Sequence, residues 1–567
     1  MSRSTPFPKN ELLRYRQVSF PEAGKSYLLA MGTVQNRTGL RYKDYALRAK
    51  ASRDGLEAIL FDEEPLRKLR TDRDLYWTTE PADDGAFFLY APSAKKYLNL
   101  DGQGARLSRK KQPLTLKKNG SVYQICAENL FLRCVARDDT PFGYVFTSAT
   151  AANTVSFAFL ERVRGIPAKP VGAKRLTAGS VSDVHIDYGV QCKAPYLRKA
   201  VFRAADAYRR RYDLDALITC GDTISDNGSH PLYNRGVLQG KFSREKFRKI
   251  QELMQKTLER SFRDPESRKN IFWISGNHDC QVGDRQPEGK RFNSNDWTHL
   301  LPQDLRHPLF RPAPMDVGVQ EELLCYEYRV KGIPFLMLNT PLYPFAPHNP
   351  HVPDPHRPAP GHTLEQADWL EARLTEIEGE QGKNAVVFVL SHYPFHRGSF
   401  ISYNPNCPSN LDAYVKMDKI LNRFPNLFWC YGHVHGTDDW ITHRNSAECM
   451  QSHGTVEMNL SEGGELICND SPDRGNFRSD LILGEGFQSV FAGSLAYFET
   501  SYFQNDGKRF RSGLTDLEVP FAQGLAVEVY EDRVVLTMEN FGTKEGTALI
   551  RGGTYKLKPM IYPLKKR

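Results

Sequence analysis

Apolar and polar residues alternate in short runs over residues 26–163, and no stretch of this region has the spacing of an amphipathic helix. An alternation with a period of two predicts β-strands that bury one face. Three approximate repeats begin at the segments SYLLAM, AFFLYA and VYQICA. Because one such unit cannot bury its own apolar face, the repeats predict an all-β domain at 26–163, preceded by an N-terminal extension at 1–25.

The pattern changes after residues 164–179, where the segment RGIPAKPVGAKRLTAG has the proline, glycine and lysine content of a linker. Beyond it, apolar runs alternate with amphipathic stretches such as YLRKAVFRAADAYRRRY and TLEQADWLEARLTEIE. This alternation predicts a layered α/β domain at 180–545. The stretch GLAVEVYEDRVVLTMENF predicts a closing β-hairpin, residues 440–483 look like an irregular decoration of this domain, and a basic tail follows at 546–567.

Composition adds limits on the class of protein. A chain of 567 residues is expected to form more than one domain, and its net charge of +9 is too weak at this length to predict a nucleic-acid partner. The start, MSRSTPFPKNELLRYRQ, lacks the apolar segment of a secretion signal, and no run reaches the roughly 18 apolar residues of a membrane helix. We expect a soluble, cytoplasmic protein. Ten cysteines without a CxxC pair predict neither a zinc ribbon nor a disulfide framework.

Polar clusters close five of the apolar runs in the second domain. In open α/β sheets, ligand-binding groups gather at the carboxyl ends of the strands. Carboxylate oxygens, amide oxygens and imidazole nitrogens are ligands of divalent metal ions, and residues at i and i+2 of an extended segment project to the same side. The clusters therefore predict a metal site, and they read Asp183-Val184-His185, Gly221-Asp222, Gly276-Asn277-His278-Asp279, Ser391-His392 and Gly432-His433-Val434-His435.

Taken together, these clusters resemble the signature of the calcineurin-like metallophosphoesterases: DxH, GD, GNH followed by Asp or Glu, H, and GHxH. The resemblance covers about residues 176 to 545 and implies a four-layer α/β/β/α sandwich with a two-metal centre. It also implies the ligands. Asp183, His185 and His435 would hold one ion, Asn277, His392 and His433 the other, and Asp222 would bridge them.

The resemblance further implies the catalytic roles. His278, beside Asn277, would contact the substrate phosphate and donate a proton to the leaving oxygen, and an imidazole suits that transfer near neutral pH. Two ions about 3.5 to 4 Å apart, with Asp222 between them, would activate water for in-line attack. Manganese, iron and zinc all accept such ligands. Arg397 is a candidate phosphate contact, and an ordinary surface arginine is the alternative.

Subfamily motifs leave the substrate open. The segments GDTISDNG and SGNHDC lack both arginines of the serine/threonine phosphatase motifs GDxVDRG and RGNHE, and Ser225 stands where purple acid phosphatases carry a tyrosine ligand. We therefore predict a metal-dependent hydrolase of phosphomonoesters or phosphodiesters. The alternatives are a scaffold or binding protein that acts through the N-terminal β domain, and a nuclease.

Two further segments carry predictions. The N-terminal repeats resemble a β-trefoil of the ricin-like or fascin-like kind, through fragments such as KYLNLDGQGARLS. That resemblance implies a glycan, lipid headgroup or protein ligand, with a docking domain that has no ligand as the alternative. The loop at 341–362 concentrates four histidines among prolines, and it is interpreted as a surface loop, a substrate-facing lid or a third metal site.

Overall fold

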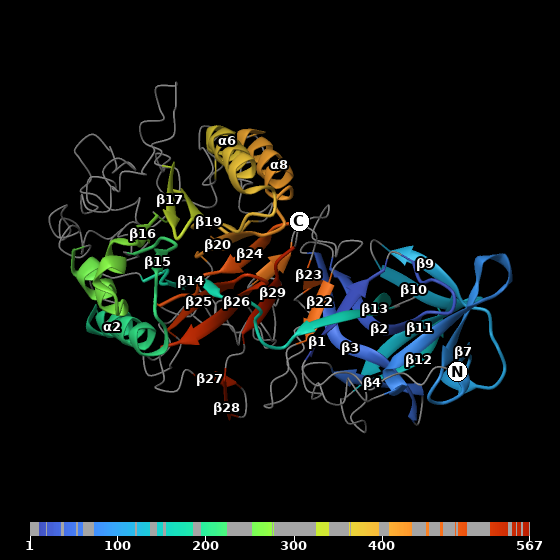
Figure 1. The fold of residues 1–567 in the computed structure, drawn as a ribbon. Coiled ribbons are helices and arrows are strands. Elements are labelled where there is room, and N and C mark those ends of the chain that lie inside the picture. The colour runs from blue at the N-terminus through green and yellow to red at the C-terminus, as the bar shows by residue number, and fades with distance from the viewer. Residues whose placement is uncertain are drawn as a thin grey trace, which may run out of the picture. The chain divides into compact units, whose positions relative to one another are not determined.

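The structure is a computed structural model in which the chain forms two units, residues 1–171 with 451–485, and residues 172–450 with 486–567. Both units are drawn in Figure 1. The structure describes residues 11–18, 20–35, 39–52, 55–60, 73–119, 122–136, 144–150, 155–184, 194–223, 252–274, 276, 325–339, 362, 364–395, 408–433, 450–452, 465–468, 482–483, 486–495, 522–541, 547–550, 553–556 and 559–565.

The first unit is rich in β-structure. Alternate residues of its strands are buried, as in β6, where Phe87, Leu89 and Ala91 point into a core that also holds Trp77 and Phe157. Its strands are β1 (Glu11–Gln17), β2 (Ser26–Gln35), β3 (Gly39–Ser52), β4 (Gly55–Leu60), β5 (Tyr76–Pro81), β6 (Phe87–Ala91), β7 (Lys96–Asp101), β8 (Gly104–Ser108), β9 (Thr115–Asn119), β10 (Val122–Ala127), β11 (Leu130–Ala136), β12 (Tyr144–Thr150), β13 (Ser156–Pro167), β22 (Glu465–Cys468) and β23 (Ile482–Leu483), and its 3₁₀ turns are η1 (Arg73–Leu75) and η2 (Asp83–Gly85).

The strand pairings of this unit close on themselves. Strand β13 pairs with both β10 and β2, and the intervening order is β10-β11-β12-β4-β3-β2, so the pairings return to β13. The pairings are antiparallel wherever neighbouring strands of this circuit meet. This confirms a β-rich N-terminal region, and it gives every strand of the circuit a partner on both sides.

Two short strands join the first unit from far along the chain. Strand β22 pairs antiparallel with β1, from Leu13 opposite Cys468 to Arg16 opposite Glu465, and β23 pairs with β22. The sequence pattern predicts that residues 440–483 decorate the second domain. In the structure, residues 451–485 group with the first unit instead. Residues 11–17, which the sequence places in an extension, likewise form a paired strand.

The second unit contains two six-stranded sheets and three long helices in the part that the structure describes. The first sheet has the order β16-β15-β14-β25-β26-β29 and the second β17-β18-β19-β20-β24-β21. The elements are β14 (Lys174–Ser180), α2 (Ala194–Arg211), β15 (Ala216–Thr219), η3 (Glu259–Ser261), η4 (Pro265–Lys269), β16 (Ile271–Trp273), β17 (Cys325–Val330), β18 (Ile333–Leu338), α6 (Leu364–Gln381), β19 (Val387–Ser391), α8 (Pro408–Leu421), β20 (Leu427–Tyr431), β21 (Met450–Ser452), β24 (Gln488–Phe491), β25 (Gln523–Tyr530), β26 (Arg533–Asn540), β27 (Thr547–Ile550), β28 (Gly553–Lys556) and β29 (Met560–Pro563).

The strands predicted from apolar runs form the centres of these sheets. In the first sheet β14, β15 and β16 are parallel, and in the second β18, β19, β20 and β24 are parallel. Every residue of β15, β16, β18, β19 and β20 is buried, because helices or the other elements cover them. The predicted hairpin is confirmed as β25 and β26, and β29 from the predicted tail pairs with β26.

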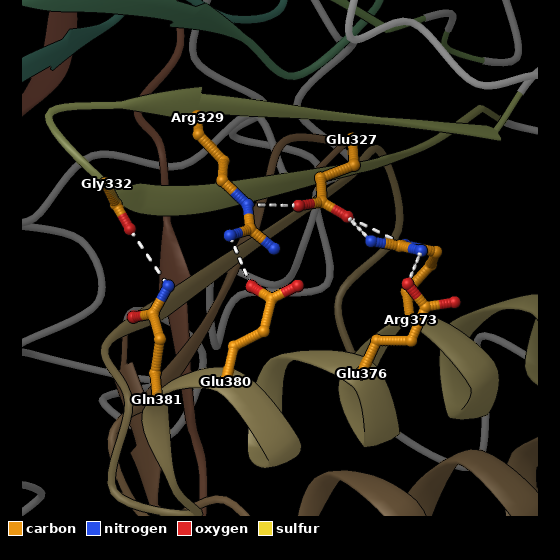
Figure 2. Close-up of polar contacts among 7 residues, drawn as sticks. All are labelled: Glu327, Arg329, Gly332, Arg373, Glu376, Glu380 and Gln381. Carbon is orange, nitrogen blue, oxygen red and sulfur yellow. Dashed lines mark hydrogen bonds and ion pairs between the residues drawn. The ribbon is translucent and has the colours of Figure 1, made fainter.

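Helix α6 is held against the β17–β18 hairpin by a polar network (Figure 2). The carboxylate of Glu327 accepts from Arg329 Nε at 2.6 Å and from Arg373 Nε at 2.7 Å. Arg329 also binds Glu380, and Gln381 donates to the carbonyl of the turn between the two strands. Glu327 and Arg373 are almost fully buried, so each charge depends on the other for compensation. Helix α8 lies beside α6, and no helix in the described ranges is long and apolar enough to cross a membrane.

Candidate metal centre

Four of the predicted ligands lie at the carboxyl ends of parallel strands in the second unit. Asp183 and Asp222 follow β14 and β15 of the first sheet, and His392 and His433 follow β19 and β20 of the second. Three of these four residues have a left-handed backbone, with φ of 49° at Asp183, 51° at Asp222 and 69° at His433. Such conformations cost roughly 1–3 kcal/mol each in non-glycine residues, and they cluster at functional sites.

Asp222, His392 and His433 form a candidate metal site. One ligand atom from each lies within 4.8 Å of the other two. His392 Nε2 lies 3.2 Å from Asp222 Oδ2 and 3.2 Å from His433 Nδ1. Asp222 and His392 are buried and His433 is exposed, so the cluster reaches solvent on the His433 side.

The orientation of His392 makes its Nε2 atom a suitable ligand. Its Nδ1 atom lies 2.7 Å from the carbonyl oxygen of Cys220. Because a carbonyl only accepts, Nδ1 carries a proton, and Nε2 is the ring nitrogen that faces Asp222 and His433. A hydrogen bond of this kind on the second ring nitrogen is usual for histidines that bind metal ions.

Electrostatics at His392 point to a cation in the cluster. Burial by itself would lower the pKa of His392, but the Asp222 carboxylate, with Asp183 and the Cys220 carbonyl, outweighs burial and raises this pKa to about 9. The carboxylate and the two imidazoles are electron-rich groups that repel one another at these distances. A proton on His392 relieves that repulsion in the metal-free protein, and a divalent cation would relieve it by displacing the proton.

Asp183 lies next to the cluster and joins the two sheets. The backbone N–H of His433 donates to Asp183 Oδ1 at 2.9 Å and to Oδ2 at 3.1 Å, and the Ser182 hydroxyl donates to Oδ2 at 2.7 Å. These donors fix the orientation of the Asp183 carboxylate at the ends of β14 and β20. The other site predictions lie outside the described residues: His185, Asn277, His278, Arg397 and His435.

Glycines at three strand ends leave room for the ligands. A Cβ atom on Gly221 would lie 2.7 Å from His392 Nδ1, and one on Gly432 would lie 2.5 Å from Asp183 Oδ2. A Cβ atom on Gly276 would collide with the Asp222 carboxylate. The donor types, their burial and this close approach of backbone fit a divalent metal ion held by mixed nitrogen and oxygen ligands.

One buried histidine lies behind the site, in a role that its sequence context does not predict. His362 belongs to the proline-rich loop of residues 341–362, and its side chain is fully buried. Its Nε2 atom lies 2.7 Å from the hydroxyl of Ser391, the residue before His392. His362 therefore does not belong to a surface loop, while His348, His351 and His356 lie outside the described residues. Its position directly before the predicted helix at TLEQADWLEARL is the one signal that could have marked it.

A comparison with known protein families agrees with the features of this candidate metal site. The family model described as calcineurin-like phosphoesterase matches residues 178–437. This chain contains a calcineurin-like phosphoesterase domain. All four candidate ligands that the structure describes lie within the matched range, and metal-dependent hydrolysis of phosphoesters is the general chemistry of this domain.

Solved structures give weaker likenesses to the chain. A conserved protein of Streptococcus pneumoniae described as a predicted phosphoesterase is 10% identical, with 69% of this chain and 98% of that chain covered and a TM-score of 0.21. GAP50, the anchor in the inner membrane complex of Plasmodium, is 11% identical, with coverage of 70% and 90% and a TM-score of 0.26. Phosphopantetheinyl hydrolase from Mycobacterium tuberculosis is 14% identical, with coverage of 47% and 85% and a TM-score of 0.22. Scores this low carry no inference, and no curated protein matches the chain.

Proposed function

We propose that the protein hydrolyses phosphoesters at a two-metal centre. The observation that carries this proposal is the convergence of Asp222, His392 and His433 at the carboxyl ends of strands from two sheets, inside a calcineurin-like phosphoesterase domain. Asp222 would bridge the two ions, Asp183, His185 and His435 would hold one, and Asn277, His392 and His433 would hold the other. The ligand types suit manganese, iron or zinc.

The proposed architecture is a four-layer α/β/β/α sandwich. Its support is the pair of six-stranded sheets. Helix α2 shares a hydrophobic core with β15 and β16, and α6 is bound to β17 through Arg373 and Glu327. Aromatic contacts join the sheets, since Phe272 of β16 lies 5.2 Å from Phe335 of β18 between ring centroids. In the first unit, the closed circuit of strand pairings supports a β-trefoil-like arrangement.

The chain's own residues would act in the reaction as follows. Bound metal ions supply an activated water and neutralise negative charge on the phosphoryl group. His392 keeps its ring direction through the Cys220 carbonyl, and Asp222 presents its carboxylate from a buried position. His433, on the exposed side of the cluster, marks where substrate enters. His278 contacts the phosphate and donates a proton to the leaving oxygen, and Arg397 adds a second phosphate contact.

Hydrolysis of a chromogenic phosphodiester and of the matching monoester, with manganese, iron or zinc added to stripped protein, tests this proposal. We expect turnover of one ester class, and a loss of more than about 100-fold in kcat/KM for Asp222→Asn and His433→Ala, because both remove a direct ligand. His278→Ala should lower kcat while metal affinity stays at the wild-type value. Full activity in Asp222→Asn would refute the site assignment.

For the N-terminal unit we propose a glycan-binding face on β6 and β7. Phe88 and Tyr90 lie on the half-buried, outward side of β6, and Tyr97 of β7 lies beside both, with ring centroids 6.2 and 5.0 Å away. Lys111 Nζ lies over the Phe88 and Tyr97 rings at 5.0 and 5.2 Å. Such a row of rings suits stacking against the apolar face of a sugar. Lys111 Nζ also forms an ion pair with Glu80 at 2.8 Å, so the charge beside the rings is compensated and the face suits a neutral sugar.

Binding of the full chain to a heparin-derived oligosaccharide, to a neutral oligosaccharide and to anionic lipid vesicles tests this face. We expect the neutral oligosaccharide to bind, because Glu80 compensates the charge of Lys111, and we expect Tyr90→Ala to weaken this binding with no effect on ester hydrolysis. Binding to vesicles alone would assign the face to lipid headgroups instead. Equal oligosaccharide affinity of Tyr90→Ala and wild type would remove the face from consideration.

A further inference from the structure

A continuous hydrogen-bonded chain of buried side chains lies directly behind the metal ligand His392. The His362 ring forms its centre, with Nε2 at 2.7 Å from Ser391 Oγ and Nδ1 at 2.8 Å from Gln366 Oε1. The Gln366 amide nitrogen donates to the carbonyl of Asn339 at 2.8 Å. All four residues are buried. The chain thus connects the end of β18, the first turn of α6 and the end of β19.

The hydrogen bonds of this chain have one consistent direction. Because Gln366 donates through its nitrogen to Asn339, its oxygen accepts from Nδ1–H of His362. Burial lowers the pKa of His362 to about 4, so the ring is neutral and its Nε2 accepts from the Ser391 hydroxyl. That hydroxyl oxygen in turn accepts from the backbone N–H of Tyr393 at 3.2 Å. His362, Gln366 and the Ser391 hydroxyl each donate one hydrogen bond and accept another within this network.

This direction matters because it fixes the backbone on both sides of His392. The Ser391 hydroxyl and the Tyr393 N–H belong to the residues immediately before and after the ligand, and their hydrogen bond closes a serine turn around it. The Tyr393 ring also lies edge-on to His392 and His433, with centroids 5.4 and 4.8 Å away. His362 packs edge-on against Trp429 at 5.4 Å, so its ring cannot shift without disturbing β20.

An apolar side chain would fill the same space at lower desolvation cost. A buried polar chain with every link made specifies one geometry, whereas an apolar filler permits several. The geometry that this chain specifies is the direction of the His392 ring, which Cys220 holds from the opposite side. We propose that His362 is a positioning residue of the metal centre, which acts through the Ser391 hydroxyl to aim His392 at the metal ion. This inference rests on the proposed function.

Titration of the metal-stripped full chain with cobalt(II) tests the proposal, because calorimetry gives the affinity and visible absorption reports the ligand geometry. We expect His362→Phe, which keeps a ring and loses both hydrogen bonds, to weaken cobalt(II) binding by about 10–100-fold and to alter the absorption spectrum. Ser391→Ala should weaken binding to a similar extent. The double variant should lose no more than either single one, because both remove the same interaction.

Tyr328→Phe is the matched control, since it removes one buried hydrogen bond, from the Tyr328 hydroxyl to Asn270, on β17 of the same sheet. It should lower stability and leave cobalt(II) affinity unchanged. If His362→Phe does not fold, Ser391→Ala alone decides the matter. Unchanged affinity and spectrum in Ser391→Ala, or an equal loss of affinity in Tyr328→Phe, would overturn the proposal. A wild type that binds no cobalt(II) would instead refute the two-metal function, while binding without hydrolysis leaves the His362 measurement intact.

Discussion

Replacement of Gly221 by alanine should destabilise the fold and distort the candidate metal site, because the new methyl group would collide with the atoms around it. Gly221 has a φ of 89°, and a Cβ atom there would lie 2.6 Å from the Gly276 nitrogen, 2.7 Å from its Cα and 2.7 Å from His392 Nδ1. Two of these atoms are backbone, and the third belongs to a ring that the Cys220 carbonyl holds. None can move aside without disturbing the strand ends that carry the ligands.

The cost of Gly221→Ala has two parts. A left-handed backbone costs a non-glycine residue about 1–2 kcal/mol, and overpacking a filled site adds about 1–3 kcal/mol. We therefore expect a loss of about 2–5 kcal/mol in the free energy of unfolding. Gly332, in the β17–β18 turn, has a φ of 78° and nothing within 4 Å of its Cβ position. Gly332→Ala should cost only the first part, so the difference between the two variants isolates the collision.

Urea unfolding of the metal-stripped proteins and cobalt(II) titration of the folded ones measure both consequences. Gly221→Ala should unfold at a lower midpoint than Gly332→Ala and should bind cobalt(II) more weakly, because His392 Nδ1 must move away from the new methyl group. Gly332→Ala should keep the wild-type affinity. Equal midpoints and equal affinities in the two variants would show that the strand ends are not packed as described.

Two further predictions concern buried charge and protonation. Glu327→Gln should lower the free energy of unfolding by about 3 kcal/mol, because it removes the buried carboxylate and leaves Arg373 with only the exposed Glu376 as its ion-pair partner. Glu376→Gln, at a side chain that is 53% exposed, should cost less than about 1 kcal/mol. Equal costs would contradict the buried ion pair. Burial lowers the pKa of His362 to about 4, so the unfolded chain, near 6.5, takes up a proton first as the pH falls. Between pH 6.5 and 4 the metal-stripped wild type should lose about 3 kcal/mol of stability that His362→Phe keeps, and parallel pH profiles of the two would refute this.

Local sequence patterns were sufficient to predict the buried strands of the second unit and the polar residues at their ends. The buried strands β15, β16, β18, β19 and β20 are short apolar runs, and the polar residues that end such runs include the candidate ligands Asp183, Asp222, His392 and His433. This works because a parallel strand covered on both faces must be apolar throughout, and the change to polar residues marks where it ends. The β-rich character of the N-terminal region followed in the same way from its alternation.

Pairings between distant segments had no comparable signal. Strand β22 covers only Glu465–Cys468, and nothing in those residues indicates a partner at β1, more than 400 positions earlier in the chain. Similarly, nothing in the helical pattern around Gln366 indicates that its side-chain oxygen accepts from His362. Both cases depend on which side chains or strands meet in three dimensions, and local propensity does not encode that.

The candidate metal ligands are easier to recognise in the sequence than the groups that orient them, because many of the orienting groups are main-chain atoms. Main-chain atoms supply much of that support: the Cys220 carbonyl sets the tautomer of His392, the His433 N–H holds the Asp183 carboxylate, and the N–H of Asp183 donates to the Gly221 carbonyl at 3.0 Å. A substitution at Cys220 leaves its carbonyl in place, so the side chain there carries no record of this role. The glycines do carry one, because the backbone can approach the ligands this closely only where no Cβ intervenes. Substitution at Gly221, Gly276 or Gly432 is therefore the direct route by which a sequence change outside the ligand set would disable the site.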